Sequence, residues 1–320
     1  MREAHKLTAA RAHPRLLQPA AVAAALALFV AVGGVGVYRY VRSYWLYRGF
    51  PPPHDPAFVR ETGQVLNIHV VSPALGGRSQ RVEVYLPPGY DQNPTQRYPV
   101  FYLLHGFPGS PDGFIRTVRV GVVEDTLFAK HQLQPMILVM PFGSTGVFTD
   151  REWANGISPH QGWETFVVRD VVRAIDARYR TIPTGAARAL GGLSEGGYAA
   201  LNLGFHHPKE FHVLESWSGY EKASDVGSIF GHRRPLLERN SPLMTLPRAA
   251  RTLRRDHTYI WMYSGKEDSL EHQNLRFAAE LRRLHVPHRF FLVSGGHNWA
   301  LWRGNAWQAL TVASTHLAHA

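Results

Sequence analysis

The chain has 320 residues, of which 45% are hydrophobic, so it can form one large domain or two small ones and is not globally disordered. The absence of cysteine excludes disulfides, thiolate metal sites and a cysteine nucleophile. The net charge of +11 is uneven, because residues 1–60 carry eight Lys or Arg against two acidic residues. This excess flanks an apolar segment, which favours anionic lipid headgroups over nucleic acid as a partner. The remainder has no nucleic-acid-binding motif.

Residues 20–38 form an uncharged apolar stretch, AAVAAALALFVAVGGVGVY. At about 1.5 Å per residue, a helix of this length nearly crosses a ~30 Å hydrocarbon core. Cations precede it, and Tyr, Trp and Arg follow it as at a membrane interface. We therefore predict a basic segment 1–19 and a single-pass transmembrane anchor 20–38; a cleaved signal sequence and a buried core helix are the alternatives. The slight excess of cations before the span places the following domain outside the cytoplasm.

Residues 39–60 include Pro51, Pro52 and Pro53 and are expected to be a linker, whose latter part forms a stiff spacer between the bilayer and the domain. Residues 61–320 are expected to form one domain in which strands and helices alternate, which predicts an α/β fold. The expected strands are 65–72, 81–86, 98–104, 135–140, 187–193, 213–218, 258–264 and 289–293, and the expected helices are 163–179, 275–281, 299–317 and one after residue 194. Residues 220–255, rich in Pro and Arg, are expected to be an irregular cap over the site.

The segment Gly192-Leu193-Ser194-Glu195-Gly196 matches the pattern G-x-S-x-G. An expected strand precedes it and an expected helix follows it at once. A turn this tight lifts the serine hydroxyl out of the sheet to the positive end of the helix, where developing negative charge is stabilised. Ser194 is therefore the candidate nucleophile. The alternatives are a plain glycine-rich turn and a dinucleotide-binding turn, and the latter fails at its second glycine.

Acyl transfer needs two N–H donors for the carbonyl oxygen in the transition state. We expect one from the backbone of Glu195, directly after the nucleophile. The other is expected from Phe107, because the segment HGFPG follows the strand 98–104 and Pro108 has no N–H to donate. A simple tight turn is the alternative interpretation of HGFPG.

The general base must follow the nucleophile and the acid along the chain. Among the 18 histidines, His297 lies in the loop directly after the last expected strand, whereas the other late histidines lie near helices or in the tail. The acid should follow the strand 258–264, where Glu267 and Asp268 are adjacent. We choose Asp268, with Glu267 as the reserve, to orient the imidazole of His297.

With these residues in place, the chain resembles the putative-esterase family of α/β-hydrolases, which includes esterase D, feruloyl esterases and mycolyltransferases. The segments that carry the resemblance are YPVFYLLHGFPGS, GWETFVVRDVVRAIDARYRT, ARALGGLSEGGYAALNLGFHHPKEF, GKED and GGHNWALWR, over about residues 63–312. The resemblance implies a mostly parallel central sheet of about eight strands with helices on both faces. Glu195 departs from the family, which often has Met after the nucleophile; if it is buried, its pKa should rise.

The leading hypothesis is a membrane-anchored serine carboxylesterase that hydrolyses a small-molecule or lipid ester and needs no metal or cofactor. An acyltransferase that passes the acyl group to a sugar or lipid alcohol is the second hypothesis, with Trp299, Trp302 and Arg303 as a candidate acceptor groove. A third, of another class, is a non-catalytic membrane-tethered binding module.

Overall fold

The structure is a computed structural model that describes residues 19–224 and 226–319. The chain divides into two compact units, one up to Trp45 and one from Leu46 onward. The first unit holds most of helix α1 (Pro19–Tyr47). Within its segment Ala21–Tyr47, an 18-residue window has a mean hydropathy of 2.2 and no buried residue, so among the described residues this is the one helix long and apolar enough to cross a membrane. A signal sequence or a membrane anchor would both look like this.

The second unit is built on an eight-stranded sheet with strand order β1-β2-β4-β3-β5-β6-β7-β8. The strands are β1 (Gln64–Ser72), β2 (Arg78–Leu86), β3 (Val100–Leu104), β4 (Ile137–Pro141), β5 (Arg188–Leu193), β6 (Val213–Trp217), β7 (Tyr259–Gly265) and β8 (His288–Val293). Strands β1 and β2 pair antiparallel with each other, and β2 pairs antiparallel with β4, whereas the other six strands run parallel. This sheet confirms the expected mostly parallel α/β-hydrolase-like architecture.

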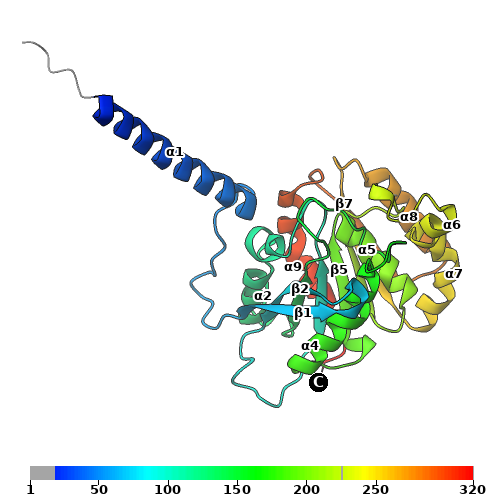
Figure 1. Ribbon diagram of the computed structural model, residues 1–320. Coiled ribbons are helices and arrows are strands. Elements are labelled where there is room, and N and C mark those ends of the chain that lie inside the picture. Colours follow the sequence, from blue (N-terminus) through cyan, green and yellow to red (C-terminus); the bar gives the residue numbers. More distant parts are fainter. Residues whose placement is uncertain (1–18, 225, 320) are drawn as a thin grey trace, which may run out of the picture. The chain divides into compact units, whose positions relative to one another are not determined.

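Helices cover both faces of the sheet (Figure 1). The α-helices are α2 (Val120–Ala129), α3 (Trp163–Thr165), α4 (Val172–Arg178), α5 (Glu195–His206), α6 (Arg234–Arg239), α7 (Pro242–Arg255), α8 (Glu271–Arg283) and α9 (Trp299–His316). Two π-helices, η2 (Gly113–Val118) and η3 (Phe166–Val171), and three short 3-10 helices, η1 (Pro73–Leu75), η4 (Gly185–Ala187) and η5 (Val226–Ser228), complete the set. Helices α2 and α9 pack on one face, and α3 to α5, α7 and α8 pack on the other.

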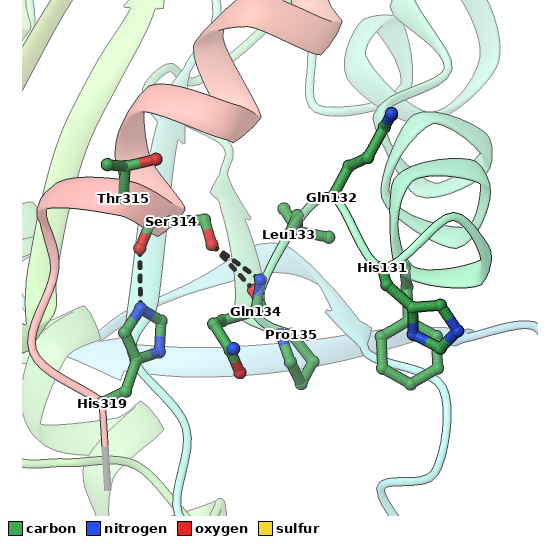
Figure 2. A pocket seen from close by; sticks show the side chains of 9 residues that line it. His131, Gln132, Leu133, Gln134, Pro135, Ser314, Thr315 and His319 are labelled. Atoms are coloured by element: carbon green, nitrogen blue, oxygen red, sulfur yellow. Dashed lines mark hydrogen bonds between the residues drawn. The ribbon is translucent and has the colours of Figure 1, made fainter.

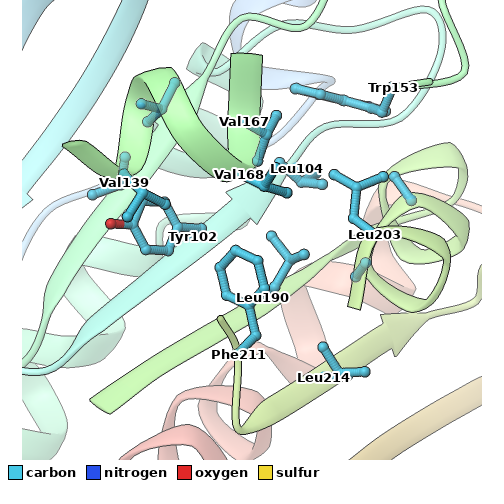
Figure 3. Close-up of a cluster of buried hydrophobic side chains, with 14 of the residues drawn as sticks. Tyr102, Leu104, Val139, Trp153, Val167, Val168, Leu190, Leu203, Phe211 and Leu214 are labelled. Atoms are coloured by element: carbon cyan, nitrogen blue, oxygen red, sulfur yellow. The ribbon is translucent and has the colours of Figure 1, made fainter. Parts of the chain in front are cut away.

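The core follows from the alternation of side chains along buried strands. All five residues of β3 are buried, with Phe101 and Leu103 in the cluster under α2 and α9, and Tyr102 and Leu104 in the opposite cluster. Figure 3 shows the second cluster, where Tyr102, Leu190 and Phe211 lie together below the helices. Because both faces are apolar, the polar groups that carry chemistry lie at the ends of the strands.

Two expectations about connecting segments were wrong. Residues 234–255 are not irregular, because α6 and α7 form there, and Leu246, Ala250 and Leu253 of α7 are buried in the core. Helix α7 packs on α5 and α8 and is therefore part of the layer that covers the sheet. The linker expected over residues 39–60 is helical up to Tyr47, where α1 ends. The segment after the helix is not a free spacer, because the guanidinium of Arg48 lies 5.3 Å from the ring of Trp299 and the ring of Phe50 lies 4.7 Å from the guanidinium of Arg303.

Candidate active site

The bend between β5 and α5 carries Ser194. Its backbone has φ 55° and ψ −121°, a left-handed conformation that costs a non-glycine residue about 1–3 kcal/mol. Small neighbours permit the bend, since a Cβ on Gly192 would lie 2.3 Å, and one on Gly196 1.8 Å, from the carbonyl oxygen of Leu104. The glycines of the motif are therefore required by close backbone contact with β3.

We expect Gly196→Ala to destabilise the protein by at least about 2–3 kcal/mol, because the added methyl group meets backbone that cannot move aside. The free energy of unfolding, measured by denaturant titration, tests this. Gly304→Ala is the matched control, because that helical glycine has no atom within 4 Å of its Cβ position, and the change should be neutral or stabilise by up to about 1 kcal/mol. Equal stabilities of wild type and Gly196→Ala would contradict the steric argument.

The structure brings Ser194, His297 and Asp268 together in one chain of hydrogen bonds. The Oγ of Ser194 is 2.8 Å from Nε2 of His297, and Nδ1 of His297 is 2.8 Å from Oδ2 of Asp268. The loop that holds His297 follows β8 and ends at Asn298, whose side chain caps α9 by accepting hydrogen bonds from the N–H groups of Ala300 and Leu301. A serine hydroxyl, an imidazole and a carboxylate in this order can transfer a proton from the hydroxyl.

Asp268 is held in place as an anion. Its side chain is completely buried, and its oxygens accept hydrogen bonds from His297, from the hydroxyl of Ser218 and from the N–H of Leu270. Burial alone would raise the pKa of Asp268, but the hydrogen bonds from His297 and Ser218 outweigh it and hold the pKa below its usual value. The reserve candidate Glu267 is exposed and accepts a hydrogen bond from the N–H of Gly295 at 2.5 Å, so it does not contact the imidazole.

The two expected oxyanion donors flank the nucleophile. Glu195 follows Ser194 as the first residue of α5, and the loop with Phe107 passes close by, since a Cβ on Gly106 would lie 2.9 Å from Cβ of Ser194. Within residues 19–224 and 226–319, neither the Phe107 nor the Glu195 N–H has a hydrogen-bond acceptor. Both donors are therefore free for a ligand oxygen.

The buried side chain of His105 holds the loop that contains Phe107 in place. Its Nε2 accepts a hydrogen bond from the N–H of Gly143 at 3.2 Å, so Nδ1 carries the proton and faces the carbonyl oxygen of Gly106 at 3.0 Å. The carbonyl of His105 accepts a hydrogen bond from the indole of Trp153. Burial lowers the pKa of His105 to about 4, so the ring is neutral at physiological pH.

This burial predicts a pH dependence of stability. The unfolded state binds a proton on His105 below about pH 6.5 while the folded state does not until about pH 4, so the stabilisation is lost as the pH falls through this window, by up to about 3 kcal/mol. Unfolding free energies of wild type and His105→Gln, measured between pH 4 and 8, should differ most at neutral pH. A difference that does not change with pH would contradict the assignment of a buried neutral ring.

Ser194 also lines a hollow of about 370 Å³. Its other lining residues come from three loops and two helices: Phe107, Asp150, Glu152, Glu195, Tyr220, Lys222, Ser224 and Gln273. Glu195 is 5% exposed, and its burial, next to the charges of Asp150 and Glu152, raises its pKa well above the usual value, as expected for a buried carboxyl at this position. The segment after β6 contributes only its beginning, residues 220–224, to this hollow.

A second hollow, of about 460 Å³, lies between the segment 128–135 and the end of α9 (Figure 2). Ser314 exchanges hydrogen bonds with the backbone of Gln134 there, and His319 bonds to the carbonyl of Ser314. Because it lies where β4 begins, it is at the opposite edge of the sheet from Ser194. Its lining residues include no hydroxyl paired with an imidazole, so it is not the candidate site.

Two of the three residues expected to form an acceptor groove, Trp302 and Arg303, have packing roles, and Trp299 stands edge-on to Trp302 at 5.2 Å between ring centroids. Trp302 is 5% exposed, donates its indole N–H to the carbonyl of Trp217, and stands edge-on to His297 at 5.1 Å between ring centroids. Arg303 donates to the carbonyl of Thr117. Trp302 and Arg303 therefore hold α9 against the neighbouring backbone of Trp217 and Thr117, and Trp302 packs against the imidazole of His297.

Sequence reasoning missed Ser218, Asp150, Glu152 and Tyr220. Ser218 had one available signal, its position directly after a strand, whereas the others lie in segments without a periodic pattern. The described residues contain no group of three or more His, Asp or Glu arranged to hold a metal ion.

The fold and the serine–imidazole pair at the carboxyl ends of the parallel strands are those of an ester-acting serine hydrolase. More particularly, the chain belongs to the family described as "Putative esterase", which matches residues 72–311.

Individual relatives are similar at moderate identity. An uncharacterised protein of Corynebacterium glutamicum is 27% identical over 231 residues, 68% of this chain and 53% of that protein, so this chain spans about half of its length. The diacylglycerol acyltransferase/mycolyltransferase Ag85A of Mycobacterium leprae is 27% identical over 245 residues, 68% of each chain. Among solved structures, a ferulic acid esterase has a TM-score of 0.71 at 25% identity and covers 80% of this chain and 100% of its own.

Proposed function

We propose that this chain is a membrane-anchored serine carboxylesterase with Ser194, His297 and Asp268 as its catalytic triad. The observation that carries the proposal is the unbroken hydrogen-bond chain from the Ser194 hydroxyl through both nitrogens of His297 to the buried Asp268 carboxylate, with 2.8 Å at each step. The substrate is a small-molecule or lipid ester.

In the acylation step, Oγ of Ser194 attacks the ester carbonyl while Nε2 of His297 takes the hydroxyl proton. The carbonyl oxygen becomes an oxyanion, which the N–H groups of Phe107 and Glu195 stabilise. Collapse of this intermediate breaks the ester bond, and the leaving alcohol takes the proton from His297. Water then attacks the acyl-enzyme, gives a proton to His297, and releases the acid as the proton returns to Ser194. Asp268 stabilises the imidazolium in both halves and stays ionised.

An acyltransferase is the second candidate, because one relative carries the name diacylglycerol acyltransferase/mycolyltransferase. The two candidates differ only in whether water or an alcohol attacks the acyl-enzyme. Products of ester turnover should be analysed by chromatography with and without a sugar and a long-chain alcohol. We expect free acid to remain the main product in all mixtures. If most of the acyl groups were transferred to an added alcohol, the protein would be an acyltransferase and not a hydrolase.

The apolar part of α1 supports the anchor, because its described side chains through Tyr44 are exposed, and an exposed apolar stretch of this length is typical of a membrane span. We expect the full-length chain to stay with membranes during alkaline carbonate extraction. Protease added to intact cells should reach the catalytic unit, because four cations precede the span and three follow directly after it. A soluble product shortened at its N-terminus would show that α1 is a cleaved signal sequence.

A further inference from the structure

Three carboxyl groups converge on the hollow that Ser194 lines. Asp150 and Glu152 come from the loop after β4, and Glu195 comes from the first turn of α5. Glu152 is completely buried and Glu195 is 5% exposed. Carboxyl groups are costly to bury unless a cation or hydrogen bonds compensate them, so this arrangement needs an explanation.

The protein supplies little compensation for these groups. Oε1 of Glu152 accepts a hydrogen bond from Ser224, but its buried Oε2 has no partner in the described part of the chain. Burial raises the pKa of Glu152 to about 7, and burial also raises the pKa of Asp150. Among the residues that line the hollow, Lys222 is the only cation, and its side chain is exposed.

Aromatic rings complete the lining. Tyr220 is stacked on the buried Tyr198, with 4.6 Å between ring centroids and 13° between planes, so its ring is held rigidly. Phe107 is 42% exposed and also lines the hollow. Aromatic faces next to carboxylates attract ammonium groups, quaternary ones in particular, because the ring quadrupole and the negative charge act together.

We infer that the hollow binds an ammonium group of the substrate, so that the preferred esters carry a primary or quaternary ammonium in the part next to the scissile bond. This inference rests on the proposed esterase function and names its substrate class. A substrate cation in this hollow provides a counter-charge for Asp150 and Glu152, since the exposed Lys222 is the only cation among the residues that line it.

The test compares two esters of the same shape, butyrylcholine and 3,3-dimethylbutyl butyrate, which differ in having a quaternary nitrogen or a carbon at one position. For the wild-type full chain in detergent, we expect kcat/KM to be about 10-fold to 100-fold higher for the choline ester, because only its ammonium group interacts with the carboxyl groups and aromatic rings. Asp150→Asn and Glu152→Gln should bring this ratio down toward 1, chiefly through a lower kcat/KM for the choline ester.

Both substitutions keep the local hydrogen bonds. In Asp150→Asn the side-chain amide oxygen can still accept from the N–H of Glu152, which bonds to Oδ1 of Asp150 at 2.8 Å, and in Glu152→Gln an acceptor remains for Ser224. Asp256→Asn is the matched control, because it removes one negative charge just before β7, at the opposite edge of the sheet, and it should leave the ratio unchanged. Unchanged thermal unfolding of the variants confirms that they fold.

Equal kcat/KM of the two esters in wild type would overturn the ammonium site and leave the esterase proposal standing, as would a choline preference that both variants retain. Preference for a neutral sugar ester over both compounds would overturn it in favour of hydroxyl recognition. Failure to hydrolyse these esters and p-nitrophenyl acetate alike, without acylation of Ser194, would contradict the proposed function itself.

Discussion

Replacing Ser194 with alanine is expected to lower kcat/KM for ester hydrolysis by about 10⁴-fold to 10⁶-fold, to the residual level that binding and oxyanion donors provide without a nucleophile. The reason is geometric, because Oγ is the atom that the bend after β5 presents to Nε2 of His297. Hydrolysis of p-nitrophenyl acetate by purified wild type and variant measures the effect, and thermal unfolding checks that the fold is kept.

Ser294→Ala is the control for this substitution. Ser294 is exposed and lies in the same loop as His297, so loss of its hydroxyl removes no hydrogen bond of the triad and should change kcat/KM by less than about 3-fold. If Ser194→Ala retained a tenth or more of the wild-type activity, another residue would have to be the nucleophile.

The second large effect is expected for Asp268→Asn, which should lower kcat by about 10⁴-fold. An amide at this position has a donor and one acceptor in place of a carboxylate, so it can hold the imidazole in the wrong tautomer and cannot stabilise the imidazolium. The adjacent substitution Glu267→Gln should change kcat by less than about 3-fold, since Glu267 bonds to the N–H of Gly295 and not to His297.

This pair of variants separates the two carboxylates that adjoin each other in the sequence. Steady-state kinetics on the same ester give both numbers, and in Glu267→Gln the N–H of Gly295 can still bond to the oxygen of the new side-chain amide. A large loss of kcat in Glu267→Gln together with a small loss in Asp268→Asn would show that Glu267, and not Asp268, is the acid of the triad.

The sheet was predictable from the sequence because its strands are short apolar runs bounded by Gly, Pro and polar residues. Each of the eight expected strands is present, with ends shifted by up to three residues. Helix α7 was missed because Pro247 lies inside it and removes one backbone hydrogen bond, which is typical of a helix end. Its apolar residues Leu246, Ala250 and Leu253 nevertheless recur at intervals of four and three, and core packing outweighs the proline.

The nucleophile and the histidine could be proposed because each lies at a recognisable junction, directly after a strand. The preference for Asp268 over Glu267 could not be settled from sequence, since a single residue step in a turn decides which carboxylate faces inward. The carboxyl groups of Asp150 and Glu152 could not be predicted at all. They meet Glu195 only because the loop after β4 folds back across the end of β5, a contact that depends on tertiary structure and leaves no periodic signal.

The central claim is that Ser194 carries the acyl group during turnover. The direct measurement is to quench the protein within milliseconds of mixing with a slowly deacylated p-nitrophenyl ester and to locate the acyl group by peptide mass spectrometry. We predict one acyl group per chain, on the peptide that contains Ser194, and its absence in Ser194→Ala. An acyl group on another side chain, or turnover without any acylated peptide under conditions that give a product burst, would contradict the account.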